Sequence, residues 1–218
     1  MERSIENIWK EGFLKSDALV APKVVDLYNK KSIHIIDKFK RMFRINLIAI
    51  VVFSFVALVM SFYIGIPIMG SIFFITLTAL VIVNKKLLNG LEEIDKGENS
   101  YEYLKDFNNW VDKQVSVNKR ISRFLYPVIF MSMVLGFYFK DAEGMYLGER
   151  LIIHQLNHFP DMILIFGIPL VGVIGVVVVI GLLAFFGTRI YEWDLNLVYG
   201  RIFKKLHELL KDVEELRD

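Results

Sequence analysis

The sequence of 218 residues contains no cysteine. This absence excludes disulfides, thiolate nucleophiles and cysteine-based zinc sites. The sequence also lacks a phosphate-binding glycine loop, a GxGxxG pattern and a Ser/His/Asp set, so we expect no enzymatic activity, no catalytic residues and no cofactor. The formal net charge of +2 is too small to argue for direct nucleic-acid binding. The opening MERSIENIWKEGF lacks an apolar core followed by small residues, so we expect no cleavable signal peptide.

Long apolar runs are what the sequence has in abundance, with 55% hydrophobic residues and a mean hydropathy of +0.46. Residues 45–64, 68–83, 121–139 and 162–187 form four runs that approach or exceed the length of about 20 residues needed to cross a bilayer as a helix. The tight turn at 65–67 predicts an antiparallel hairpin of the first two spans. The sequence therefore predicts an all-α, integral membrane four-helix bundle.

Basic residues are distributed very unevenly between the segments that connect these runs. Residues 1–44 hold ten of the 26 Lys and Arg side chains, residues 84–123 hold eight and residues 188–218 hold six. Because basic residues favour the cytoplasmic side, we expect a multi-pass protein of the inner (cytoplasmic) membrane with both termini in the cytoplasm. The cytoplasmic segments are then 1–44, 84–120 and 188–218, and residues 140–161 form an extracytoplasmic loop between the last two spans.

The interior of the four runs holds no ionisable side chain. Because intramembrane charges usually mark ion and proton paths, this absence argues against an ion-coupled pump. The last run is instead rich in glycine: Gly167, Gly172, Gly175, Gly181 and Gly187. Small residues allow helices to pack closely in lipid, and without a clean GxxxG motif we favour packing within the chain over dimerisation.

Two of the segments outside the membrane have helical periodicity. In residues 23–44, where Pro22 suits the first turn of a helix, apolar side chains recur at mostly three- and four-residue spacing: Val25, Tyr28, Ile35, Phe39 and Met42. In residues 100–118, with Asn99 or Ser100 as the cap, one helical face carries Leu104, Phe107, Trp110, Val111 and Val115. We expect each segment to form an amphipathic cytoplasmic helix.

The extracytoplasmic loop contains the only pair of histidines with metal-ligand spacing. The stretch GERLIIHQLNHF predicts a short amphipathic helix in the headgroup layer. It would place His154 and His158 on one face, with Glu149 or Asp161 as a third ligand. No glutamate follows His154 as the zinc protease motif requires, and histidine is common at membrane interfaces. We therefore expect interfacial residues here and no metal site.

The C-terminal segment is the most regular part of the chain. Its apolar residues alternate at four- and three-residue spacing over three heptads: Leu195, Tyr199, Ile202, Leu206, Leu209, Val213 and Leu216. We call these residues the heptad seam. Because mostly charged residues flank it, the seam requires a partner helix, which is the 23–44 helix and the 100–118 helix of the same chain or the seam of a second copy. No proline follows Pro169, so span four and this tail form one rod that can bend at Gly187 or Gly200.

Three stretches, DLNLVYGRIFKKLHELLKDVEELR, IENIWKE and KKSIHIIDKFKR, carry a resemblance together with the four-span layout. The chain resembles a group of uncharacterised inner-membrane proteins of Bacteroidota that are often encoded beside extracytoplasmic-function sigma factors. The resemblance implies a regulatory role, such as holding a sigma factor at the membrane. The zinc-type anti-sigma motif needs cysteines that this chain lacks, and no functional residue is carried over from the family.

These observations favour a non-enzymatic regulatory or scaffold protein of the membrane. Its cytoplasmic helices would form a platform for a protein partner or a second copy, and its other partner is membrane lipid. Two alternatives are also compatible with the sequence. One is a carrier or channel for an apolar or lipid-like molecule, and the other is a structural subunit of a larger membrane complex.

Overall fold

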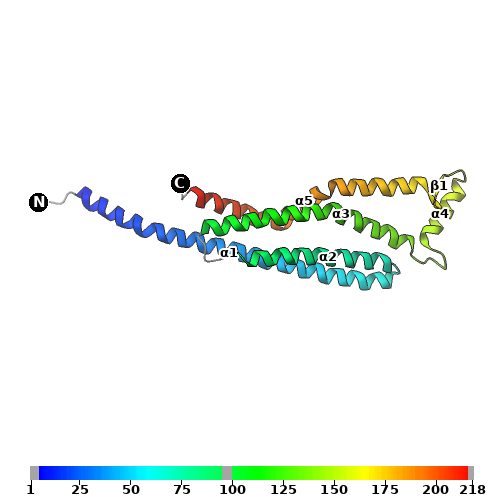
Figure 1. Ribbon diagram of the computed structural model, residues 1–218, viewed down its shortest axis with the longest axis horizontal. Coiled ribbons are helices and arrows are strands. Elements are labelled where there is room, and N and C mark those ends of the chain that lie inside the picture. The colour runs from blue at the N-terminus through cyan, green and yellow to red at the C-terminus, as the bar shows by residue number, and fades with distance from the viewer. Residues whose placement is uncertain (1–4, 95–99, 216–218) are drawn as a thin grey trace.

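The computed structural model describes the backbone of residues 5–94 and 100–215 and the side chains of residues 30–94 and 101–212. Within these ranges the chain is almost entirely helical and elongated, and the start of α1 and the end of α5 lie at the same end of the molecule (Figure 1). The elements in chain order are α1 (Ile5–Ile64), α2 (Pro67–Glu92), α3 (Ser100–Tyr138), α4 (Leu147–His158), β1 (Leu164–Ile165), β2 (Ile168–Pro169) and α5 (Leu170–Glu215).

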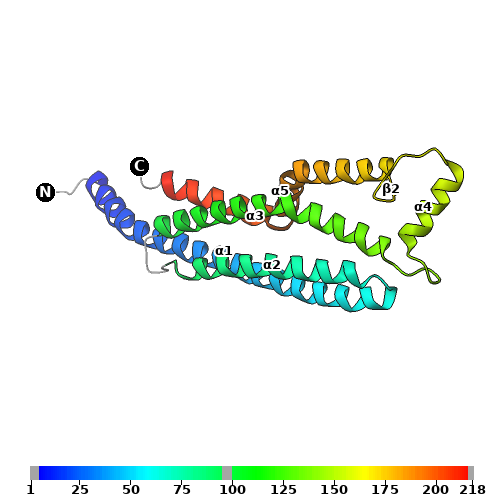
Figure 2. The same cartoon turned by 45° about the vertical axis from the view of Figure 1, so that its right-hand side comes forward.

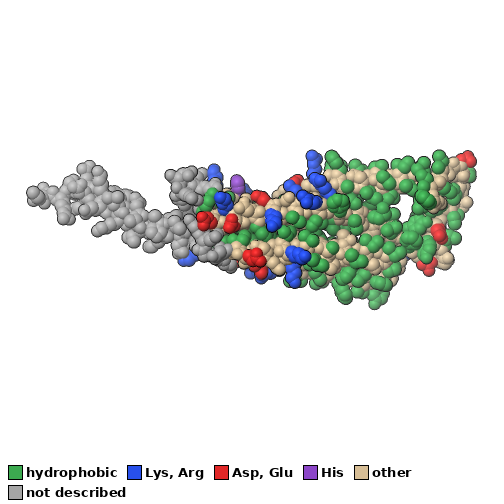
Figure 3. All heavy atoms as spheres, viewed as in Figure 1, with side chains coloured by type: hydrophobic (Ala, Val, Ile, Leu, Met, Phe, Trp, Pro, Cys, Tyr) green, Lys and Arg blue, Asp and Glu red, His purple; other side chains and the backbone are tan. Residues whose placement is uncertain are grey.

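Four of these helices are long and apolar enough to cross a membrane, which confirms the all-α, four-span prediction. They divide the molecule into an apolar half (residues 45–83, 121–139 and 170–187) and a charged half (residues 30–44, 84–94, 101–120 and 188–212), and residues 140–169 connect α3 to α5 at the end of the apolar half. Charged side chains gather over the second half and hydrophobic side chains cover the first on the face in Figure 3. In the apolar half large hydrophobic side chains point outward, including Phe53, Ile75 and Val171 at 60%, 66% and 73% exposure. A bilayer suits such a surface and water does not.

The helices are more continuous than the sequence pattern indicates. α3 joins the predicted cytoplasmic helix to the third span without a break, and Pro127 lies inside it. α1 begins at Ile5, so the prediction that Pro22 occupies a first helical turn is wrong. A proline inside a helix removes one backbone hydrogen bond and kinks the helix, and a long helix can absorb that loss.

The hairpin of α1 and α2 is as predicted from its tight turn. Gly65 turns the chain at φ +80°, Ile66 N–H donates to the Ser61 carbonyl at 2.8 Å, and Pro67 lies in the first turn of α2. Gly70 then approaches α1 so closely that a Cβ atom would lie 1.8 Å from Ser61 Oγ. The two spans therefore pack in contact from the turn onward.

The start of the predicted fourth span is wrong. Residues 164–169 form a short antiparallel hairpin, in which Ile165 pairs with Ile168, and the helix begins only at Leu170. Phe166 and Gly167 both have positive φ, 49° and 78°, as the two central residues of a type I′ turn require. The apolarity that predicted a helix is equally compatible with a hairpin. Gly167 supplies one of the two positive φ angles of the turn, and Pro169 immediately precedes the first residue of the helix. α4 and this hairpin lie at the end of the molecule far from the start of α1 (Figure 2).

Candidate functional site

The heptad seam lies inside the charged half. Tyr199, Ile202, Leu206 and Leu209 are 2–8% exposed, and Leu195 packs against them at partial exposure. The side chains of Val213 and Leu216 lie outside the described residues. The seam joins one core cluster with residues of the other three long helices: Ile35, Ile36, Phe39, Phe43 and Leu47 of α1, Leu88 and Leu91 of α2, and Tyr103, Leu104, Phe107, Trp110 and Val111 of α3. Both internal candidate helices thus cover the seam, and no second copy is needed to bury its described residues.

An aromatic core organises this cluster, and we define it as Phe39, Phe43, Phe107, Trp110 and Tyr199. The ring of Phe39 is central, with centroid distances of 5.3 Å to Phe107 and 5.2 Å to Tyr199. Its contact with Trp110 is edge to face at 5.8 Å, a favoured geometry for aromatic rings. The Trp110 indole N–H donates to the Leu87 carbonyl at 2.8 Å, so its polar atom is satisfied. The core therefore joins α1, α3 and α5 and reaches the backbone of α2.

Several of the residues in this core were expected from sequence periodicity. The prediction that Phe39 and Ile35 lie on the buried face of the first amphipathic helix is confirmed, and Met42 packs at the edge of the cluster. The side chains of Val25 and Tyr28 lie outside the described residues, as does Asn99. The predicted face of the second amphipathic helix is also confirmed, from Leu104 to the partly buried Val115.

Sequence reasoning missed a buried polar layer between the two halves, formed by Asn84, Gln114 and Asn118. All three are 4–5% exposed. Asn84 and Asn118 exchange reciprocal side-chain amide hydrogen bonds of 3.0 and 2.9 Å between α2 and α3. Each amide also donates to a carbonyl of its own helix, those of Leu80 and Gln114. The sequence does contain an indication that Asn84 is buried. It lies seven residues from Leu77 and from Leu91, on the apolar face of α2.

Beside the polar layer is a cavity of about 140 Å³ between the four long helices. Asn84, Gln114, Tyr191, Asp194 and Tyr199 line it among apolar side chains. This volume suits a few water-sized molecules and excludes a lipid. The cavity is therefore a small chamber with mixed polar and apolar walls at the border of the apolar half.

The two tyrosines of the chamber differ in hydrogen bonding. The Tyr199 hydroxyl accepts a hydrogen bond from Asn46 Nδ2 at 3.2 Å, whereas the buried Tyr191 hydroxyl, beside the Gln114 amide, has no hydrogen bond of good geometry within the described residues. Burial raises the pKa of both hydroxyls above the ordinary value of 10.0, and the nearby Gln114 side chain only partly offsets this for Tyr191. Both hydroxyls therefore stay protonated at physiological pH.

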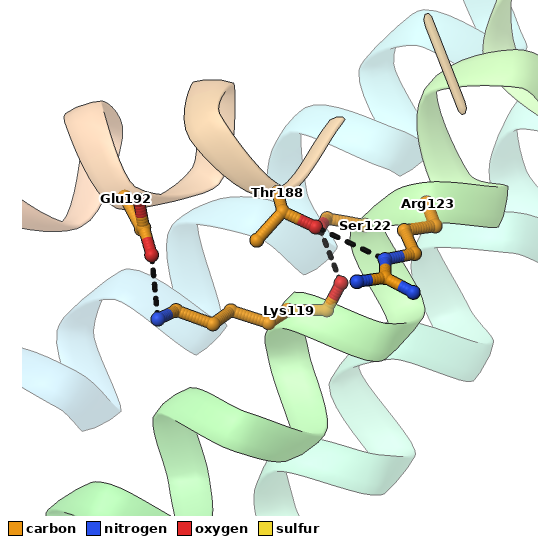
Figure 4. A network of polar contacts seen from close by, with 5 residues as sticks. All are labelled: Lys119, Ser122, Arg123, Thr188 and Glu192. Carbon is orange, nitrogen blue, oxygen red and sulfur yellow. Dashed lines mark hydrogen bonds and ion pairs between the residues drawn. The ribbon is translucent and has the colours of Figure 1, made fainter. Parts of the chain in front are cut away.

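Polar contacts clamp α3 to α5 at the same level (Figure 4). Lys119 Nζ lies 2.5 Å from Glu192 Oε1, and Arg123 Nε donates to Thr188 Oγ1 at 3.2 Å. Because both ion-pair partners are partly exposed, the pair adds little stability of its own. Gly187 permits the approach, since a Cβ atom there would lie 2.8 Å from the Ser122 carbonyl oxygen. α5 remains helical through Gly187 and Gly200, so the predicted continuity of span four and the tail is confirmed, and the helix changes direction between its apolar and charged parts (Figure 2).

The other glycines of α5 do not pack within the described chain. A Cβ atom at Gly172, Gly175 or Gly181 would meet nothing within 4 Å, and Gly167 lies in the turn before the helix. The prediction of close intramolecular packing along this face is therefore correct only at Gly187. The apolar part of α5 stands away from the α1–α2 hairpin in both ribbon views (Figures 1 and 2), which explains the open space.

The histidine pair lies on α4, where its spacing predicts. The rings of His154 and His158 are 4.6 Å apart, and His158 Nδ1 lies 2.9 Å from the His154 carbonyl oxygen, so this nitrogen is the donor. The structure does not bring Glu149 or Asp161 to them as a third ligand. Over the described residues, no group of three or more His, Asp or Glu side chains is placed to hold a metal ion.

Comparison with known proteins identifies no relative of this chain. No family model, curated protein or solved structure gives a significant match to the chain.

Proposed function

We propose that this chain is a non-enzymatic regulatory or scaffold protein of the inner membrane, with four spans and both termini in the cytoplasm. The charged half is then a cytoplasmic platform. The observation that carries the proposal is continuity: α1, α3 and α5 each run from the apolar half into the charged half, where they share one aromatic core. A close-packed core transmits strain, so a displacement of one span shifts the platform helices with it.

The platform would bind a partner by its outer surface, because the heptad seam is already covered. The backbone of α1 extends past the end of α5 at the charged end of the molecule (Figure 1), and it offers a helix on which another protein can pack. The partner that the family resemblance implies is an extracytoplasmic-function sigma factor. We propose such a cytoplasmic protein as the occupant, held close to the membrane until a signal shifts the spans.

Co-purification tests this proposal. Tagged protein isolated from native membranes in mild detergent is expected to carry a cytoplasmic partner. Leu209→Asp should release that partner, because Leu209 is 2% exposed and an unpaired carboxylate in the core disrupts the platform. Leu197→Asp introduces the same change on the same helix at a residue that is 75% exposed. It should retain the partner, because it leaves the core intact and does not lie on α1, the helix on which the partner is proposed to pack.

Membrane-fraction levels should be equal for both variants, since neither substitution lies in a span. Partner retention by the Leu209→Asp variant, or a wild-type protein that brings down no partner, would refute the platform. Lipid flux in reconstituted liposomes, unaffected by Leu209→Asp, would instead favour the carrier alternative.

A further inference from the structure

A groove between α1 and α2 lies at the border of the two halves, and the platform proposal does not use it. Its volume is about 520 Å³, and it is open along one side. Ile48 and Val52 of α1 and Val81 of α2 form its walls, and Arg44 and Lys85 lie at its charged end. Pockets of about 300 to 1,000 Å³ are typical of small-molecule sites. We call this feature the α1–α2 groove.

The apolar end of the groove faces the membrane. The side chains of Ile48 and Val52 are 63% and 57% exposed, and Leu47 and Leu88 form a buried floor beneath them at 8% and 5%. A concave apolar surface at membrane depth is covered by hydrocarbon, because contact between apolar side chains and water is unfavourable. An acyl chain is the occupant with the right shape and chemistry for this end.

Helix geometry places the charged end at headgroup depth. Lys85 lies 20 residues beyond Gly65 in the turn of the hairpin. At about 1.5 Å per residue this separation is roughly 30 Å, which matches the hydrocarbon thickness of a bilayer. Asn46 and Lys85 each lie 15 residues from the Ser61–Gly70 contact, so Arg44 and Lys85 reach nearly the same depth. With the turn at one surface of the hydrocarbon, both cations therefore lie at the other.

The charges at this end are those that an anionic headgroup needs. Arg44 is paired with Glu92, whereas Lys85 has no ion-pair partner among the described residues. Asn89, one helical turn beyond Lys85, also lines the groove and adds an amide donor. The two cations and one carboxylate leave one net positive charge. Figure 3 shows further Lys and Arg side chains gathered along the same border, which raises the local positive potential.

We propose that the α1–α2 groove binds one anionic glycerophospholipid, with its phosphate at Lys85 and Asn89 and an acyl chain along Ile48, Val52 and Val81. Basic pockets between membrane helices recognise anionic headgroups in this way. The site would select phosphatidylglycerol-type lipids over zwitterionic phosphatidylethanolamine. This inference requires membrane insertion but is independent of the platform function.

Native mass spectrometry of the delipidated full-length protein tests the site. The protein is titrated with phosphatidylglycerol and with phosphatidylethanolamine that carry the same acyl chains. We expect one phosphatidylglycerol to be retained preferentially. Lys85→Gln should weaken that binding about fivefold, because one headgroup charge contact is lost.

The neighbouring Lys86→Gln is the matched control, since Lys86 is also exposed, lies next to Lys85 on α2 and does not line the groove. It should leave phosphatidylglycerol binding unchanged. Val52→Trp fills the apolar end without altering any charge, and it should reduce the binding of both lipids. Equal retention of the two lipids by the wild-type protein, or equal losses in the Lys85→Gln and Lys86→Gln variants, would overturn the proposal and leave only a diffuse surface charge.

Discussion

Replacement of Phe39 by alanine is expected to loosen the charged half of the molecule without preventing membrane insertion. Phe39 is 1% exposed, and its ring centroid lies within 6.0 Å of five other rings: Phe43, Phe107, Trp110, Tyr199 and Phe203. Truncation of a buried phenylalanine to alanine costs about 3 to 5 kcal/mol through lost transfer free energy and the cavity left behind. Because these five rings are held on three separate helices, they cannot collapse fully into the space, and we expect a loss of about 4 kcal/mol.

Amide hydrogen exchange in detergent micelles measures this loss locally. If the core amides of α3 and α5 exchange by opening of the charged half, about 4 kcal/mol corresponds to roughly a thousandfold loss of protection. The effect should appear in residues 101–111 and 199–209, which surround Phe39 in the cluster. Residues 45–64, in the apolar half, should keep their protection.

Phe53→Ala is the matched control on the same helix. Phe53 is 60% exposed, and within the described residues its ring contacts only that of Phe73, at 6.0 Å. It should change protection in the charged half by less than tenfold. An unchanged exchange pattern in the Phe39→Ala variant, or an equal change in both variants, would refute the view that one aromatic core holds the charged half together.

The remaining predictions concern the polar layer and the span contacts, and both are read as shifts in thermal unfolding. Asn84→Ala leaves Asn118 without its reciprocal partner and should lower the free energy of unfolding by about 1 to 3 kcal/mol. Replacing both asparagines by leucine should recover much of that loss. An Asn84→Ala variant as stable as wild type would contradict this prediction. Gly70→Val forces a side chain into Ser61 and should lower the unfolding temperature. In the control variant Gly172→Val the added side chain meets open space, so the unfolding temperature should not fall. Equal unfolding temperatures of the two variants would argue against the close hairpin contact.

The parts of the fold that were predictable depend on local patterns. The length of an apolar run and the spacing of apolar residues are properties of one segment, so four spanning helices and the buried faces around Phe39 and Phe107 were readable from the chain. The hairpin at 164–169 was not, because a short apolar run does not distinguish a strand from a helix without attention to turn residues such as Gly167. The polar layer was missed for a related reason: Asn84 and Asn118 look like ordinary boundary residues until α2 and α3 are placed side by side.

The sequence by itself determined that this is an all-helical chain with four apolar spans, basic connecting segments and a tail that must bury one heptad face. These properties follow from hydrophobic period and charge, which need no knowledge of distant residues. Only the tertiary structure decided that the tail packs on α1 and α3 of its own chain and that most glycines of α5 face open space. It also placed Lys85 and Arg44 at the mouth of one groove. Each of these features joins residues far apart in sequence, and their contacts are set by how the helices cross.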